Sequence, residues 1–343
     1  MTRQVGHAGL DEDDVRIRPG KGSRPRTRRR PAHDEAVDAL VVAVDRGRYR
    51  TWVGDREVTA MKARELGRGG IVVGDNVRLA GDVSGRPDTL ARVVRVAPRR
   101  TALRRSADDT DPVERIMIAN ADQLVIVTAL ADPPPRPRLI DRFLVAALDA
   151  GLEPLLCLTK ADLASPAGLL AAYQPLGIAH LVTGRPLTEA ALDELRAALR
   201  DRVSVLVGHS GVGKSTLFNA LVPDASRAIG TVSAVTGRGR HTSSSALALR
   251  LPGGGWIIDT PGLRSFGLGH ISADNVIRAF PDLAEGAAQC RPGCSHSEPG
   301  CALDAWVAEH GGPDGPAAAR LDSLRRLLRS REGLGPAAGD DDA

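Results

Sequence analysis

Residues 208–215 have the spacing of a loop that binds nucleotide phosphates. They read Gly-His-Ser-Gly-Val-Gly-Lys-Ser and fit the pattern G-x-x-x-x-G-K-S without a mismatch, between a short apolar run and a helical pattern. The glycines let backbone N–H groups close around phosphate oxygens at the positive end of a helix dipole. We expect Lys214 to reach the β- and γ-phosphates and the Ser215 hydroxyl to ligate Mg²⁺. The other residues expected at the nucleotide are Gly208, His209, Ser210, Gly211, Val212, Gly213 and Thr216.

A second run, Asp259-Thr260-Pro261-Gly262, follows a short apolar stretch. A carboxylate at Asp259 can hold Mg²⁺ through water, and the N–H of Gly262 can sense the γ-phosphate. The pattern D-x-P-G is a common turn when it stands alone. Here the D-x-P-G run follows both a phosphate loop and an apolar strand, and this context indicates a nucleotide-site motif.

A third run, Thr159-Lys160-Ala161-Asp162, has the residue types that recognise guanine. The carboxylate of Asp162 can accept hydrogen bonds from N1–H and N2–H₂ of guanine, an edge that adenine does not offer. The stem of Lys160 can stack on the ring. Thr159 stands where Asn is more usual, so one side-chain bond to the phosphate loop is expected to change. The candidate for a second base-contacting loop is Thr183-Gly184.

The order of these three motifs is unusual. In a standard GTPase the phosphate loop opens the domain and the guanine-recognising run closes it. Here the guanine run begins at residue 159, before the phosphate loop at 208 and the Asp259 motif. This order predicts a nucleotide-binding domain whose chain is circularly permuted.

Residues 236–243 lie between the phosphate loop and Asp259 and read Thr-Gly-Arg-Gly-Arg-His-Thr-Ser. Their glycines and charge suit a mobile switch loop, in which Thr242 or Ser243 completes the Mg²⁺ shell. Leu263 stands where many GTPases carry the glutamine that orients the attacking water, and leucine cannot do this. His241 is therefore the candidate catalytic residue that positions water, and the alternative is a surface histidine in a basic loop.

Four residues near the C-terminus have the spacing of a zinc site. The pattern Cys290-x₃-Cys294-x-His296-x₄-Cys301 supplies three thiolates and one imidazole, enough to close one tetrahedral Zn²⁺ site. No ligand position is left open, so we expect a structural ion; the alternative is unrelated cysteines. Cys157 lies in the apolar run Leu-Leu-Cys-Leu and is expected in the core.

Alternating strands and helices must position the nucleotide motifs. Apolar runs predict strands that end at the guanine run, the phosphate loop and Asp259. Because the carboxyl ends of parallel strands lie at the same edge of a sheet, a mostly parallel sheet would bring the three motifs together there. The expected strands are 121–128, 153–158, 180–183, 203–207 and 256–258, and the expected helices are 139–150, 188–200 and 214–221.

Residues 36–100 have a different pattern, with five short β-prone runs at 37–44, 49–53, 57–61, 71–79 and 90–96. This spacing suits a small barrel of the OB type, with Gly74-Asp75 as a hairpin turn. Such barrels often bind single-stranded or structured nucleic acid, and the alternative is a packing module. Residues 101–112 are expected to form a charged linker.

Composition narrows the class of protein. The length of 343 residues predicts two or three domains, and the net charge of +4 is compatible with a nucleic-acid partner. No apolar run approaches the roughly 20 residues that span a bilayer, so we expect a cytoplasmic protein without membrane contact. Residues 16–30 carry eight Lys or Arg and no acid, which suits either an RNA-contacting arm or a solvated extension. The arginines of the last helix, 320–331, leave the same alternatives.

These motifs together resemble the family of ribosome small subunit-dependent GTPase A. The most specific matches are the phosphate loop, the Gly-Arg-His-Thr run at 239–242, the Asp259 motif with its continuation to Leu268, and the Cys/His cluster. The resemblance covers residues 36–332. It implies an OB barrel, a permuted GTPase domain and a C-terminal helical zinc domain, with zinc on the Cys/His cluster and water positioned by His241. The Cys/His spacings are each about one residue shorter than the usual family form.

The expected protein is a monomeric GTPase that binds GTP and GDP with Mg²⁺ and acts on the small ribosomal subunit and its rRNA. The resemblance implies hydrolysis stimulated by that subunit, in its late maturation. One alternative is a GTP-gated RNA-binding scaffold with little turnover, and another is an ATP-using P-loop enzyme. The expected division is a disordered basic tail 1–35, an OB barrel 36–100, a permuted GTPase domain 113–268, a zinc-binding helical domain 269–332 and a disordered acidic tail 333–343.

Overall fold

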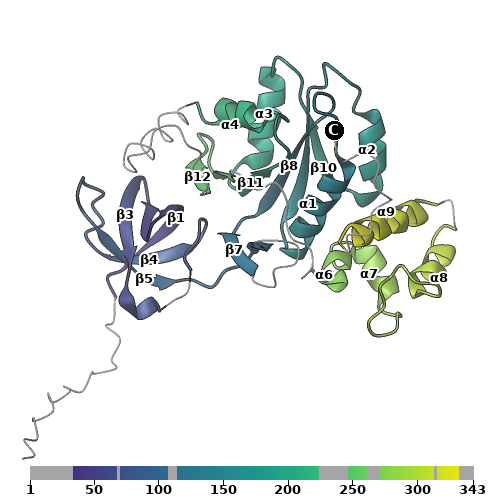
Figure 1. Cartoon of the computed structure of the whole chain (residues 1–343), viewed down its shortest axis with the longest axis horizontal. Coiled ribbons are helices and arrows are strands. Elements are labelled where there is room, and N and C mark those ends of the chain that lie inside the picture. The colour runs from purple at the N-terminus through teal and green to yellow at the C-terminus, as the bar shows by residue number, and fades with distance from the viewer. Residues whose placement is uncertain are drawn as a thin grey trace, which may run out of the picture. The chain divides into compact units, whose positions relative to one another are not determined.

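The computed structural model describes residues 34–67, 70–106, 114–223, 246–260, 271–312 and 315–331 (Figure 1). The expectations for both tails and for the switch loop therefore fall outside the described residues.

Five strands near the N-terminus form the barrel that the sequence predicts. They pair in the order β1-β2-β3-β5-β4, and β4 also pairs with β1, which closes the ring. Val41, Val77 and Leu79 fill the interior because alternate residues of a strand face opposite sides. The strands are β1 Val37–Asp45, β2 Arg48–Val53, β3 Arg56–Lys62, β4 Asn76–Gly81 and β5 Ala91–Val96, and the short helix η2 Arg64–Leu66 follows β3.

The expectation of a hairpin turn at Gly74-Asp75 is wrong. Strand β4 begins only at Asn76 and pairs with β1 and β5, so no hairpin joins it to β3. The reason lies in Asp75, whose buried carboxylate accepts a 2.8 Å hydrogen bond from the N–H of Val72 and a 2.7 Å bond from Nε of Arg99. With the 3.2 Å bond from the N–H of Asp75 to the carbonyl of Val72, they close a turn at the predicted place, but this turn leads into β4 without joining two paired strands.

A central sheet follows, with strand order β10-β9-β8-β11-β13-β12. All of its neighbours are parallel except β12, which runs antiparallel to β13. The strands are β8 Gln123–Ala129, β9 Glu153–Thr159, β10 Ala179–Val182, β11 Val203–Val207, β12 Leu247–Arg250 and β13 Trp256–Asp259. The helices are α1 Pro137–Asp149, α2 Ala167–Tyr173, α3 Glu189–Leu199 and α4 Lys214–Leu221, with the short helix η3 Gln174–Leu176 after α2.

Helices cover both faces of this sheet, so its middle strands are apolar throughout. All seven residues of β8 are buried. Leu124 and Ile126 pack in one apolar cluster with α1, while Val125 and Val127 pack in a second with α3 and α4. This is the arrangement that produces continuous apolar runs in parallel strands.

The stretch expected as a charged linker contains a strand. Strand β6, Ala102–Ser106, pairs antiparallel with β7, Glu114–Ala119, in a separate two-stranded sheet. One apolar residue of each strand anchors the pair, because Leu103 is paired with Ile118 and both side chains are buried. The flanking charges concealed this short pattern in the sequence.

The C-terminal part contains helices α6 Ala273–Ile277, α7 Pro281–Ala287, α8 Ala302–Glu309 and α9 Pro316–Arg331. Helix α9 packs on α1 and η3 through apolar residues that include Leu324, Leu327 and Leu328. Among the described residues, no helix has the combination of length and apolarity that a bilayer-crossing segment requires.

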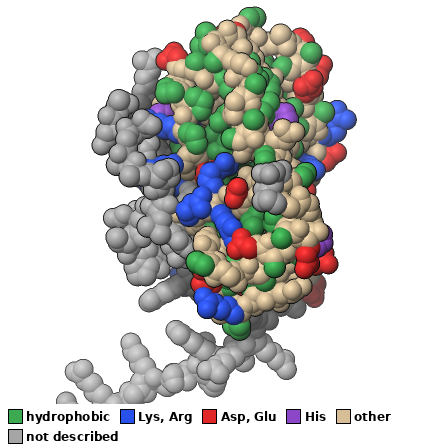
Figure 2. Space-filling model, turned by 90° about the vertical axis from the view of Figure 1, so that its right-hand side faces the viewer, with side chains coloured by type: hydrophobic (Ala, Val, Ile, Leu, Met, Phe, Trp, Pro, Cys, Tyr) green, Lys and Arg blue, Asp and Glu red, His purple; other side chains and the backbone are tan. Residues whose placement is uncertain are grey.

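Three arginines of α9 form ion pairs with carboxylates of other elements of the protein. Arg326 lies 3.1 Å from the buried carboxylate of Asp141 and stacks over the ring of Tyr173. Arg320 pairs with Asp282 at 2.8 Å, and Arg325 is discussed below with the metal site. The surface facing the viewer in Figure 2 likewise shows Lys and Arg side chains near its middle with acidic side chains among them. These contacts disfavour both sequence-based alternatives for Arg320 and Arg326, an RNA-facing surface and a merely solvated one.

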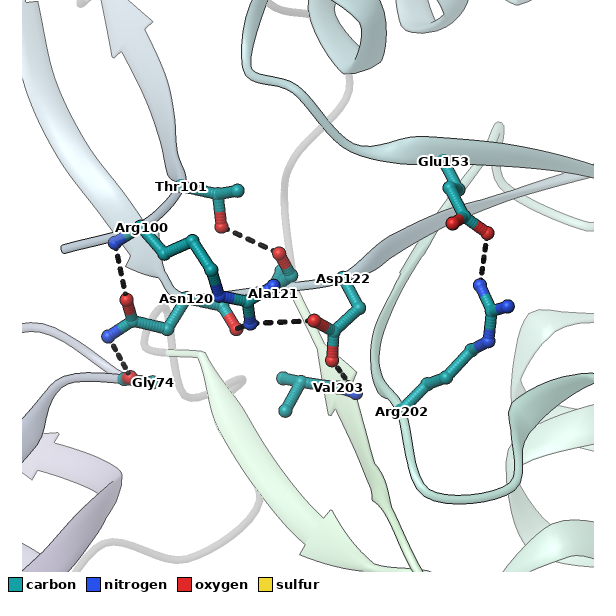
Figure 3. Close-up of polar contacts among 9 residues, drawn as sticks. All are labelled: Gly74, Arg100, Thr101, Asn120, Ala121, Asp122, Glu153, Arg202 and Val203. Carbon is teal, nitrogen blue, oxygen red and sulfur yellow. Dashed lines mark hydrogen bonds and ion pairs between the residues drawn. The ribbon is translucent and has the colours of Figure 1, made fainter.

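Asn120 connects the barrel to the first strand of the central sheet (Figure 3). Its Nδ2 donates to the carbonyl of Gly74 at 2.8 Å, and its Oδ1 accepts from the N–H of Arg100 at 2.9 Å. Asn120 has a φ of 54°, a conformation that Asn tolerates better than most residues. Gly74 must lack a side chain because a Cβ there would lie 1.9 Å from the carbonyl oxygen of Ala119.

The same polar cluster ties together the amino ends of the sheet strands (Figure 3). Asp122 accepts from Nη2 of Arg100 at 2.6 Å and from the N–H of Val203 at 2.8 Å, at the start of β11. Glu153 and Arg202 form an ion pair at the starts of β9 and β11. A further barrel contact is the antiparallel pairing of β1 with β12. This edge is therefore structural, and the carboxyl ends of the strands remain for a functional site.

Candidate functional site

The three predicted nucleotide motifs lie at the carboxyl ends of neighbouring parallel strands. Thr159 ends β9 and is paired with Ala129, the last residue of β8. Strand β11 ends at Val207, directly before the phosphate loop, and its Leu206 is paired with Asp259 at the end of β13. The sheet thus brings the guanine run, the phosphate loop and Asp259 to one edge although the guanine run comes first in the chain.

The phosphate loop requires glycine for steric reasons. Gly208 has a φ of 148°, and a Cβ there would lie 2.2 Å from the carbonyl oxygen of Val127. Gly213 has a φ of 97° and is the N-cap of α4. Lys214 follows it and turns back over the loop, where its Nζ donates to the carbonyls of Gly208 and His209, both at 2.7 Å. The ammonium is therefore held at the loop, and Ser215 and Thr216 are exposed in the first turn of α4.

Lys214 and Asp259 influence each other electrostatically. Burial lowers the pKa of Lys214, and the nearby carboxylate of Asp259 acts in the opposite direction. Burial likewise raises the pKa of Asp259, and the ammonium of Lys214 opposes that shift. The hydroxyl of Thr260 donates to the Leu206 carbonyl at 3.1 Å and fixes the end of β13 beside β11. An opposite pair of charges at the loop is the arrangement that a Mg²⁺-bound phosphate needs.

Thr159 contacts the phosphate loop directly. Its Oγ1 donates to the carbonyl of Val212 at 2.7 Å, so the threonine still supplies a side-chain bond to the loop in place of Asn. Lys160, next to it, is buried, and its Nζ donates to the carbonyl of Asp132. A Cβ on Gly211 would lie 3.5 Å from Cδ of Pro133, so the segment after β8 contacts the phosphate loop as well.

The segment around Asp132 is the part of the site that sequence reasoning missed. The sequence marks residues 133–137 only as a Pro-rich loop, because a backbone carbonyl that holds a lysine has no signature in residue types. The one available signal was its position directly after an apolar strand, where parallel sheets place their loops along the site edge.

Asp162 lies beside the predicted second base-contacting loop. Its Oδ1 accepts a 2.7 Å hydrogen bond from the N–H of Arg185, and a Cβ on Gly184 would lie 3.6 Å from the same oxygen. The N–H of Ala161 donates to the carbonyl of Thr183 at 3.0 Å. The loop at 183–185 and the guanine run therefore form one surface at the end of β9 and β10.

Four predicted site residues fall outside the described residues. These are the candidate water-positioning residue, the two alternatives for the Mg²⁺ shell and the glycine of the D-x-P-G motif: His241, Thr242, Ser243 and Gly262. Their roles stay predictions.

The bond from Thr159 to the loop can be tested by removing its hydroxyl. We expect Thr159→Val to weaken GDP binding about fivefold, because a buried hydrogen bond contributes about 1 kcal/mol and Val212 would lose its donor. Isothermal titration calorimetry measures the change. Thr159→Ser keeps the hydroxyl and should bind within about twofold of the natural chain. Equal losses in both variants would show that packing, and not the hydrogen bond, is what matters.

The Cys/His cluster has the dimensions of a metal centre. The ligand atoms of Cys290, Cys294, His296 and Cys301 all lie within 4.8 Å of one another. The Cys290 and Cys301 sulfurs are 3.7 Å apart, and Nδ1 of His296 lies 3.6 Å from the first and 3.9 Å from the second. Zinc–sulfur bonds of about 2.3 Å at a tetrahedral angle give sulfur–sulfur edges of about 3.8 Å. The four residues therefore fit Zn²⁺.

Arg325 supports this cluster from helix α9. Its Nε donates to the backbone carbonyl of His296 at 2.8 Å, and its Nη2 pairs with Asp304 of α8 at 2.8 Å. His296 is buried and has a φ of 60°, a conformation that histidine rarely adopts without support. The arginine thus links the loop that carries His296 to helix α8, which begins directly after Cys301.

The fold and the site together define a P-loop nucleotide-binding protein with permuted motif order and a Cys₃His centre. A family profile described as RsgA GTPase matches residues 96–269. The chain belongs to the RsgA GTPase family. This confirms the resemblance inferred from the motifs.

Individual related proteins agree with this assignment. A protein from Pseudomonas aeruginosa named small ribosomal subunit biogenesis GTPase RsgA is 45% identical over 219 residues, 62% of this chain and 63% of that protein. Relatives of the same name are 41% identical in Chromohalobacter salexigens, over 76% of this chain and 75% of that one, and 36% in Chlorobaculum tepidum, over 80% and 92%. The match thus spans less than two thirds of the Pseudomonas relative.

Two solved structures share the fold. YjeQ from Thermotoga maritima has a TM-score of 0.61 at 24% identity, over 85% of this chain and 99% of that one. YloQ, described as a circularly permuted GTPase, has a TM-score of 0.63 at 23% identity, over 90% of this chain and all of that one. The predicted fold class, with its barrel, permuted P-loop domain and C-terminal Cys/His cluster, is confirmed.

Proposed function

We propose that this protein hydrolyses GTP to GDP and phosphate and acts in late maturation of the small ribosomal subunit, which stimulates the reaction. The observation that carries the nucleotide part is the meeting of three motifs at one sheet edge, with Thr159 bonded to the phosphate loop and Lys214 beside Asp259. The printed name of the relatives, small ribosomal subunit biogenesis GTPase, supports the ribosomal part.

Each residue of the site has a part in this proposal. Asp162 reads the guanine edge, and its bond to the N–H of Arg185 holds it toward the loop at 183–185. Lys214 exchanges its carbonyl partners for phosphate oxygens when GTP binds. Water attacks the γ-phosphorus, the bond to the bridging oxygen breaks, and the leaving group is GDP. His241 orients that water, since leucine occupies position 263.

Two metals belong to the proposal. Mg²⁺ held by the Ser215 hydroxyl and, through water, by Asp259, with Thr242 or Ser243 completing its shell, would neutralise charge on the β- and γ-phosphates. One Zn²⁺ at the Cys/His cluster would act structurally, because all four ligands come from the protein. A monomeric, cytoplasmic protein that grips rRNA through its barrel completes the proposal.

The test measures phosphate release with and without purified small subunits. We expect a slow basal rate that rises at least about tenfold on adding subunits, together with co-sedimentation in the presence of a non-hydrolysable GTP analogue. Asp162→Asn should lower the preference for GTP over ATP, because the amide cannot accept both guanine hydrogen bonds. A rate that subunits leave unchanged would contradict subunit-stimulated hydrolysis, an unchanged rate without co-sedimentation would contradict the ribosomal role, and equal use of ATP and GTP would contradict the guanine assignment.

A GTP-gated RNA-binding scaffold remains the second candidate. It would bind GTP tightly and co-sediment with subunits but show no gain in turnover. The same assay therefore separates the two.

A further inference from the structure

The outer face of the barrel carries a hollow that the nucleotide site does not use. Its volume is about 540 Å³, within the range of about 300–1,000 Å³ that ligand sites occupy. We call it the outer groove. The residues that define it are Asp38, Leu40, Trp52, Asn76, Arg78 and Arg95.

Strand register arranges these side chains in two rows. Arg78 of β4 is paired with Asp38 of β1 on one side and with Arg95 of β5 on the other, which gives a charged row. Leu40 is paired with Trp52 and with Asn76, which gives a row that is mainly aromatic and apolar. Residues 38 and 40 share one face of β1, so the rows lie roughly 7 Å apart on the same face.

The charged row contains an arginine that is available to bind an anion. Arg95 is exposed and makes no hydrogen bond or ion pair with any described residue. Arg78 is only loosely balanced, since its Nε lies 3.7 Å from a carboxylate of Asp38 whose side chain is 94% exposed. Solvent screens such a pair, so the row can receive a negative group.

The other row has a fixed aromatic ring. The indole N–H of Trp52 donates to the carbonyl of Gly54 at 2.9 Å. Its ring packs edge-to-face on Trp256, with centroids 5.6 Å apart. A ring held on two sides loses little freedom when a flat base stacks on it, and such stacking contributes about 1–3 kcal/mol per base.

Arg78 is also anchored beside the start of β1. Arg78 donates through Nη2 to the carbonyl of Ala36, the residue just before β1. The segment that enters β1 at this point contains eight Lys or Arg and no acid between residues 16 and 30. Asp34 and Glu35 separate this basic run from β1, so the match to a phosphodiester backbone rests on the two cations of the groove itself, Arg78 and Arg95.

We propose that the outer groove binds single-stranded RNA, with a phosphate at Arg95 and Arg78 and a base stacked on Trp52. The proposal deepens the ribosomal function above and rests on it for the identity of the partner. It places the RNA contact on the β1-β4-β5 side of the barrel.

Fluorescence anisotropy of the full chain with a labelled 12-nucleotide single-stranded RNA tests this surface. We expect Arg95→Gln to weaken binding at least about fivefold and to lower the slope of log Kd against log salt by about 0.7. The matched control is Arg92→Gln, which removes the same charge from an exposed position on the same strand outside the groove. It should change affinity less than about twofold.

The outcomes separate this inference from the proposed function. Equal effects of the two variants would overturn the groove, even if subunits stimulate hydrolysis as expected. Competition by poly-glutamate as strong as competition by poly-uridine, and equally dependent on Arg95, would overturn RNA in favour of an acidic protein partner. Loss of subunit stimulation with intact Arg95-dependent RNA binding would count against the ribosomal role and leave the groove standing.

Discussion

Replacing Lys214 with alanine should weaken GTP binding by roughly 100-fold or more. The ammonium is held at the phosphate loop by the carbonyls of Gly208 and His209, so it is in place to meet the phosphates. Each hydrogen bond between charged groups contributes about 1.5–3 kcal/mol, and two of them correspond to a factor of about 100 or more. Titration of the variant with a fluorescent GTP analogue measures the loss.

A second consequence falls on Asp259. Burial raises the pKa of this carboxyl, and Lys214 is the main group that opposes the shift. Without the lysine the pKa rises further, and the variant becomes less able to carry the negative charge expected near Mg²⁺. We therefore expect adding Mg²⁺ to restore less binding in the variant than in the natural chain.

The control for this experiment is Lys62→Ala, which removes a lysine from strand β3 of the barrel. It should bind GTP like the natural chain. A urea denaturation midpoint within the error of the natural chain shows that the Lys214 variant is folded. Unchanged GTP affinity in that folded variant would mean that the loop at 208–215 does not hold the phosphates.

Sequence reasoning succeeded where function depends on residue types at fixed spacing. The glycines of the phosphate loop are required by the backbone, as the 2.2 Å clash of a Cβ on Gly208 with Val127 illustrates. Continuous apolar runs such as β8 are typical of parallel strands covered on both faces. The position of the guanine run follows from the phosphate loop and the buried strands together, because the carboxyl ends of parallel strands lie at the same edge of the sheet.

The sequence concealed features in which backbone groups or distant partners decide the structure. Asp75 ends a strand-like run because its carboxylate takes the N–H of Val72 and the guanidinium of Arg99. Lys160 finds its partner in the carbonyl of Asp132, which any residue could supply. The arginines of α9 read as a basic surface because the acids that pair with them are far away in the chain.

One of those pairs provides the largest expected effect on stability. Arg326→Met should lower the free energy of unfolding by about 3 kcal/mol, because it leaves the buried carboxylate of Asp141 without its cation. Tyr173 still donates a 3.0 Å hydrogen bond to that carboxylate, so part of its charge remains supported. Urea denaturation at pH 5 and pH 8 measures the effect.

The loss should be larger at pH 8 than at pH 5. Burial already raises the pKa of Asp141 above its ordinary value, and Arg326 is the first group that opposes this. In the variant the pKa rises further, so the folded chain binds a proton more readily than the unfolded chain does. Stability then falls as the pH rises through the folded pKa, since folding must keep an uncompensated charge buried.

Two further variants isolate the pair. Arg329→Met removes an exposed arginine from the same helix and should cost less than about 0.5 kcal/mol at either pH. Asp141→Asn in the Arg326→Met background should regain much of the stability at pH 8, because the buried amide carries no charge and can still accept from Tyr173. Equal losses at both pH values, with no rescue by the asparagine, would mean that Arg326 stabilises α9 only through its stacking on Tyr173 and its 3.2 Å hydrogen bond to the carbonyl of Ala172.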